Sequence, residues 1–91
     1  MAIDYETIGK FACEKAKDYE RAIQTHKELV GKRNEVDAKI EEANKKDDKK
    51  LLAELYKEFR IIKQDQMANR SFRQKFCDDF LYEISQMMKE L

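Results

Sequence analysis

The sequence predicts an all-α fold: a long antiparallel helical hairpin, similar to a coiled coil, that associates into a helical bundle. The 91-residue chain has no proline and only two glycines, and 42% of its residues are charged, which favours long helices over sheet. Apolar residues recur at alternating steps of three and four along two long segments, as in a heptad repeat. A short polar stretch separates the two segments, and a chain of this length forms a single domain with a small core of its own.

The first helix is expected at about residues 4–43, with Asp4 as the residue that caps its first amides. Its seam, the row expected to face the other arm, follows heptad spacing. This row is Ala16, Tyr19, Ile23, His26, Val30, Arg33, Asp37 and Ile40. A second apolar row flanks it at seven-residue spacing, with Ile8, Ala22, Leu29, Val36 and Ala43.

The turn is expected at residues 44–48, where apolar positions stop. Asn44 tolerates the left-handed backbone conformation that ends many helices. Asp47 or Asp48 can accept hydrogen bonds from the first amides of the next helix. The second helix is therefore predicted at about residues 49–90.

The second helix has its own heptad row, which is polar in its middle third. The row is Leu52, Leu55, Phe59, Ile62, Gln66, Asn69, Arg73, Phe76, Phe80 and Met87. Ser71 and Gln74 also fit a Ser-x-x-Gln capping box. A break near residues 69–71, which would give three helices, is therefore the alternative to one continuous helix.

A turn centred near residues 47–48 places residues whose numbers sum to about 95 opposite each other. The polar positions of the two arms then meet in one layer, which we call the polar layer: His26, Arg33, Gln66, Asn69 and Arg73. Buried polar groups must bond each other or water, and such a layer can fix the register of the two arms. A small-ligand or anion pocket is the alternative reading. No metal or cofactor is expected, because the chain has one histidine and no Glu-x-x-His motif.

The chain has more apolar helical surface than one hairpin can cover. The predicted protein interface comprises Phe72, Phe76, Phe80, Leu81, Ile84, Met87, Met88, Leu91, Ile8 and Phe11. Burying each large apolar side chain is worth ~1.5–3 kcal/mol. We therefore expect a homodimer, as a four-helix bundle or a higher oligomer, and a groove that binds an amphipathic helix of another protein.

Enzyme activity is not expected, because no catalytic residues or phosphate-binding loop can be identified. Net charge is zero, there is no signal-peptide pattern or membrane-spanning run, and Cys13 and Cys77 are expected to be free thiols. The expected function is a cytoplasmic adaptor, chaperone or regulator that binds another protein. The alternative is a nucleic-acid, nucleotide or anion binder that uses a basic face: Arg60, Lys63, Arg70, Arg73 and Lys75.

Overall fold

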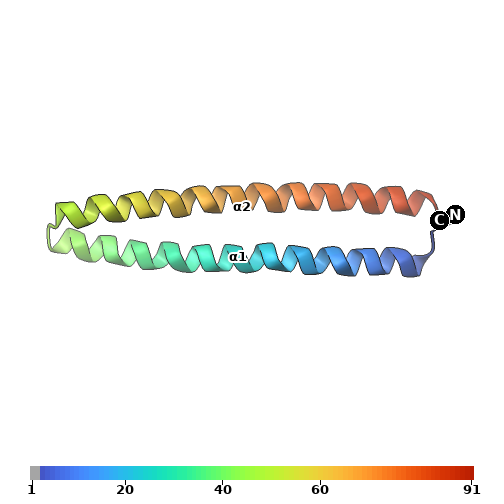
Figure 1. The fold of residues 1–91 in the computed structure, drawn as a ribbon, viewed down its shortest axis with the longest axis horizontal. Coiled ribbons are helices and arrows are strands. Elements are labelled where there is room, and N and C mark those ends of the chain that lie inside the picture. The colour runs from blue at the N-terminus through green and yellow to red at the C-terminus, as the bar shows by residue number, and fades with distance from the viewer. Residues whose placement is uncertain (1–2) are drawn as a thin grey trace.

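The computed structural model describes residues 3–91 as an antiparallel hairpin of two long helices (Figure 1). Helix α1 spans Tyr5–Lys45 and helix α2 spans Lys49–Lys89. The hairpin measures 68 × 15 × 12 Å, and the start of α1 lies beside the end of α2, at the end away from the turn (Figure 1). The predicted hairpin is confirmed. Helix α2 passes through residues 69–71 without a break, so the three-helix alternative is wrong.

Both helices begin at an aspartate that accepts a hydrogen bond from a backbone amide of the first turn. Asp4 accepts from the Thr7 amide at 2.8 Å, and Asp48 accepts from the Leu51 amide at 3.1 Å. The hydrogen bonds from the Thr7 amide and hydroxyl lower the pKa of Asp4, because they stabilise its ionised form. The two caps fix where each arm starts, and Asp48 thereby fixes where the turn ends.

The turn uses a different residue from the one predicted to take the left-handed conformation. Asn44 remains within α1, and Asp47 instead has a positive φ of 51°. Aspartate tolerates this conformation better than most residues. The Asp48 amide then donates to the Ala43 carbonyl at 3.1 Å, which satisfies one of the free carbonyls at the end of α1.

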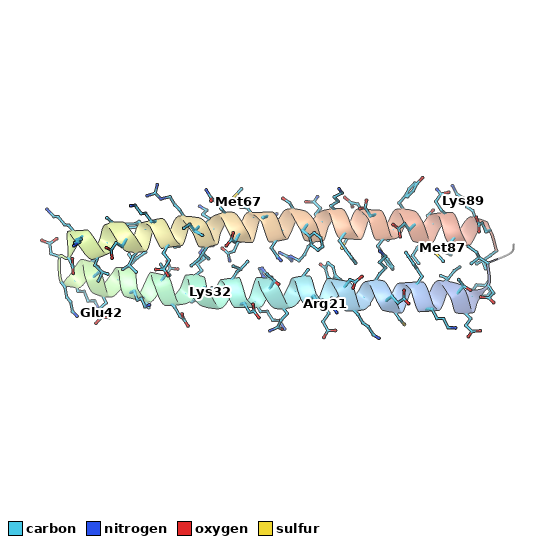
Figure 2. All side chains as sticks on the ribbon, in the orientation of Figure 1. Arg21, Lys32, Glu42, Met67, Met87 and Lys89 are labelled. Atoms are coloured by element: carbon cyan, nitrogen blue, oxygen red, sulfur yellow. The ribbon has the colours of Figure 1, made fainter. Side chains whose placement is uncertain are left out.

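The register agrees with the sum of 95 predicted from the turn. Tyr19 packs on Phe76, and their ring centroids are 5.6 Å apart. The α2 row also lies in the seam as predicted, and each of its members is buried or half-buried. Figure 2 shows the difference between seam and edge on one helix, since Met87 points toward α1 whereas Met67 points outward.

Three of the eight residues predicted for the α1 seam are wrong, because Ala16, Val30 and Asp37 are exposed. The other five are half-buried: Tyr19, Ile23, His26, Arg33 and Ile40. The row that completes the seam is the one predicted to flank it: Ala22, Leu29, Val36 and Ala43, all buried. Val36 is 3% exposed and Val30 is 36% exposed.

The physical reason why the seam contains Val36 rather than Val30 lies near the turn. Both candidate rows are apolar in mid-helix, but the rejected row continues into Asp37 and Asn44, whereas the chosen row continues into Val36 and Ala43. Burying a carboxylate and an amide without partners is costly. The chosen frame instead completes the core cluster of Val36, Ala43, Leu55 and Ile62, with Ile40, Leu52 and Phe59 packed against it.

Candidate functional site

The polar layer is half-buried and contains three hydrogen bonds. Arg33 donates from Nη1 to Oε1 of Gln66 at 3.3 Å, across the two arms. Asn69 donates from Nδ2 to the Ala22 carbonyl at 3.1 Å and accepts from Nε of Arg73 at 2.9 Å. The layer thus ties α2 to a side chain and to a backbone group of α1.

Two cationic groups of the hairpin lie over aromatic rings of the seam. The Arg33 guanidinium lies 5.2 Å from the centroid of the Phe59 ring. The ammonium of Lys15 lies 5.6 Å from the Phe11 centroid and 5.9 Å from that of Phe76. Such cation–π contacts stabilise a charge on an otherwise apolar seam, so the apolar portions of both side chains can cover the core while the charge remains near solvent.

His26 is the member of the polar layer whose ring nitrogen has no partner. Its Nδ1 atom is buried and makes no hydrogen bond within residues 3–91. No group of three or more histidine, cysteine or acidic side chains in this described part of the chain is placed to hold a metal ion. What the layer can do chemically is therefore to align the arms through its hydrogen bonds, whereas His26 contributes an unsatisfied polar atom.

The predicted interface residues lie in different places. Five of them pack in the seam at the terminal end of the hairpin: Ile8, Phe11, Phe76, Phe80 and Met87. The rings of Phe11 and Phe80 stack there with centroids 6.1 Å apart. These residues hold the two arms together.

The remaining interface residues lie on the two open sides of the hairpin. One side, which we call the Cys77 face, includes a groove between the arms lined by Ala16 of α1 and Cys77 of α2. The opposite side, the Phe72 face, includes a groove lined by Asp18, Thr25, Asp65 and Phe72. Phe72 is exposed, and its ring lies beside that of Phe76 with centroids 6.1 Å apart and planes tilted by 41°.

The Cys77 face carries an apolar stripe on α2. Cys77, Leu81, Ile84 and Met88 follow one another at steps of four, three and four, so they lie along one line of the helix. Leu81 is 64% exposed and Met88 is 56% exposed. Leu91, just beyond the end of α2, is also exposed. The stripe lies beside the seam: Ile84 is half-buried at its margin, whereas Leu81 and Met88 are left exposed by α1 of the same chain.

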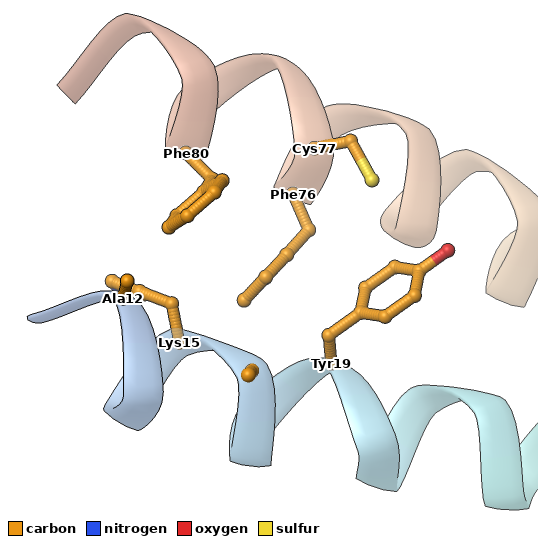
Figure 3. Close-up of a pocket in the computed structure, with 7 residues that line it drawn as sticks. Ala12, Lys15, Tyr19, Phe76, Cys77 and Phe80 are labelled. Atoms are coloured by element: carbon orange, nitrogen blue, oxygen red, sulfur yellow. The ribbon is translucent and has the colours of Figure 1, made fainter. Parts of the chain in front are cut away.

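The groove on the Cys77 face has a volume of about 220 Å³. Figure 3 shows the rings of Tyr19, Phe76 and Phe80 pointing into the space between the arms. Its other lining residues are Ala12, Lys15 and Ala16 of α1 and Cys77 of α2. Sequence reasoning missed Lys15 and Ala16 as site residues, although Lys15 stands seven positions before Ala22 on the row that proved to be the α1 seam.

The predicted basic face is divided by the structure. Arg60, Lys63 and Arg70 are exposed, and their spacing continues the line of the apolar stripe toward the turn. Arg73 instead turns into the seam to bond Asn69. Lys75 lies five residues after Arg70, about 140° around the helix, so it belongs to a different face.

Both cysteines are free thiols on the surface, and no helix among the described residues is long and apolar enough to cross a membrane. Neither a protein-family model, nor a curated protein, nor a solved structure matches this chain. Any functional assignment therefore depends on the surfaces described above.

Proposed function

We propose that this protein is a non-enzymatic helical interaction protein, an adaptor, chaperone or regulator that self-associates and binds a partner protein through its apolar helix surface. The observation that carries the proposal is the apolar stripe on the Cys77 face. Leu81 and Met88 are more than half exposed there, on a rigid helix that is anchored by the seam. Covering each such side chain is worth ~1.5–3 kcal/mol when burial is complete.

The stripe has the spacing that helix partners use. A partner helix contacts residues that recur at steps of three and four, and Cys77, Leu81, Ile84 and Met88 follow at i, i+4, i+7 and i+11. Methionine and cysteine are adaptable at such contacts. The neighbouring groove is apolar at its base, since it lies on the rings of Tyr19, Phe76 and Phe80.

The experiment compares affinity capture from the producing cells with three proteins: wild type, a stripe variant and an edge variant. The stripe variant carries Leu81→Glu and Met88→Glu. The edge variant carries Ile61→Glu and Tyr82→Glu, two equally exposed apolar positions outside the stripe. The proposal expects specific partners with wild type and with the edge variant and their loss with the stripe variant. Equal capture by all three proteins would refute it.

The second candidate function is binding of nucleic acid, a nucleotide or another anion. It is favoured by Arg60, Lys63 and Arg70, which share one exposed line of α2 with no acidic residue among them. A salt titration of the captured complex separates the two functions. Binding to phosphates weakens steeply with salt because counterions are released, whereas apolar contact is little affected.

A further inference from the structure

The two open faces of the hairpin differ in what could cover them. The Phe72 face has Asp18, Arg21 and Asp65 around its groove, and Asp65 stands between its exposed apolar side chains Phe72 and Ile61. The Cys77 face has the apolar stripe of α2. A face 68 Å long and 15 Å wide offers roughly 1,000 Å², above the ~800 Å² per partner of a typical stable interface. The Cys77 face is therefore large enough to hold a dimer together.

On the Cys77 face, the side chains of α2 are large near the termini, whereas those of α1 are small. Opposite the large residues of the α2 stripe, α1 presents Gly9, Cys13 and Ala16 at steps of four and three. All three are exposed, and Ala16 shares the groove with Cys77. A face with small side chains on one helix and large side chains on the other can pack against a second copy of the same face. The large side chains of each copy must then lie over the small side chains of the other.

Only one two-fold arrangement brings large over small. A two-fold axis parallel to the long axis of the hairpin places α2 of one copy over α1 of the other at the same height. Tyr19 and Phe76 fix the heights, because their contact shows that residue numbers at one height sum to about 95. The Ile84 side chain then lies near residue 11 of the other copy, between its Gly9 and Cys13. A two-fold axis across the hairpin would instead place α2 over α2 and large over large.

The charges toward the turn agree with this arrangement. The α2 line carries Arg60, Lys63 and Arg70, whereas the corresponding α1 line carries Glu20, Asp37 and Glu41 against one lysine, Lys27. Arg60 would lie near residue 35 of the other copy, within one turn of its Asp37. Both ion pairs found within residues 3–91 join residues four apart in sequence, Lys10 with Glu6 on α1 and Lys46 with Glu42 at its end. Opposite charges on the two arms are thus available to a second copy.

Gly9 has no role within a single hairpin. A Cβ atom added there would meet nothing within 4 Å, and glycine inside a helix costs roughly 0.5–1 kcal/mol relative to alanine. Close approach of another helix would explain the glycine. Gly31 has the same open surroundings, but it lies two residues from both Leu29 and Arg33 of the seam. It is therefore about 200° around α1 from each of them, on the outer side of the helix and away from the Cys77 face.

We infer that the Cys77 face binds a second copy of this chain about a two-fold axis parallel to the hairpin, giving a four-helix bundle with both turns at one end. The inference rests on the proposed function and specifies its self-association. It assigns Gly9, Cys13 and Ala16 as the surface on which Leu81, Ile84 and Met88 of the other copy pack.

The first test is the distance between the two turns. Lys46 is replaced by a spin-labelled cysteine in a background with Cys13→Ala and Cys77→Ala, whose mass is first checked by light scattering. Two turns at one end of the bundle predict a distance of about 25 Å, two helix diameters. A dimer with a distance near or above the 68 Å length of the hairpin would overturn the inference, while the proposed function would stand.

The second test uses the two glycines as a matched pair. Gly9→Leu puts a large side chain under the Ile84 of the other copy, and we expect the dimer to weaken about tenfold or more. Gly31→Leu should change the dissociation constant of the dimer by no more than about twofold, because Gly31 lies outside the Cys77 face. The two variants are matched, since both changes raise helix propensity equally. Circular dichroism verifies that both variants remain helical. Equal dimer constants for the two variants, or a wild-type protein that remains a single chain, would overturn the inference.

Discussion

Asn69 offers the sharpest test of the polar layer. Replacing it with alanine removes the hydrogen bond to the Ala22 carbonyl at 3.1 Å and the one from Arg73 at 2.9 Å. A neutral hydrogen bond contributes about 1 kcal/mol and one to a charged group about 1.5–3 kcal/mol. Because the site is half-buried, the lower values apply, and the higher helix propensity of alanine offsets about 0.5 kcal/mol. We therefore expect a loss of about 2 kcal/mol in the free energy of unfolding.

The assay is thermal and urea unfolding followed by circular dichroism at one fixed protein concentration, since self-association shifts the apparent stability. A loss of about 2 kcal/mol lowers Tm by roughly 8–16 °C in a domain of this size. The matched control is Asn34→Ala, because Asn34 is exposed on α1 and its replacement should slightly raise stability. If both variants had the same Tm, the polar layer would not stabilise the hairpin.

Three further predictions concern the core, the histidine and the first cap. Leu55→Ala should lower the free energy of unfolding by about 2–3 kcal/mol, because Leu55 is 4% exposed in the core cluster. The control Leu51→Ala, at a position that is 41% exposed, should lower it by less than half as much. Urea unfolding measures both changes. His26→Leu should raise the free energy of unfolding by about 1 kcal/mol in the same assay, because it removes a buried ring nitrogen without a partner; a loss of stability would show that the imidazole is bonded. The pKa of Asp4 is lowered in the folded protein from its ordinary value of 3.8. Its contribution to stability is therefore fully present above pH 3.8, and it is lost as the pH falls from there through the lower pKa of the folded state. The protection factor of the Thr7 amide should therefore fall across this acid range in wild type but not in Asp4→Asn, and identical pH profiles of the protection factor would contradict the assignment.

The sequence predicted the hairpin and its register because both depend on local signals. Asp48 and the end of the apolar pattern place the turn, and a turn of known position fixes which residues lie at one height. The Tyr19–Phe76 contact follows from that arithmetic. The α2 seam was also predictable, because only one of its rows is apolar at both ends.

The α1 seam could not be chosen by the same reasoning. Ile23 and Val30 on one row are as apolar as Leu29 and Val36 on the other, and both rows adjoin Tyr19 and His26. The structure places Leu29 and Val36 inside, and only then does it become clear that Leu81 and Phe72 belong to opposite sides of the hairpin. A pattern of residue types shows how wide an apolar surface is, but the seam decides which part of it remains open.

The partner of Asn69 was missed for a different reason. Its amide donates to the Ala22 carbonyl. Every residue has a backbone carbonyl, so the sequence does not show which one accepts a hydrogen bond. Likewise, the groove over Tyr19 and Phe76 depends on Lys15 and Ala16, whose place became clear only once the α1 frame was known.

The central claim is that the exposed apolar stripe on the Cys77 face is covered by another chain. Sedimentation equilibrium of the purified protein over a wide range of concentrations tests this most directly. We predict a particle of twice the 10.9 kDa chain mass that dissociates on dilution and that the Leu81→Glu and Met88→Glu variant does not form. A single-chain mass for wild type at every concentration would contradict the claim.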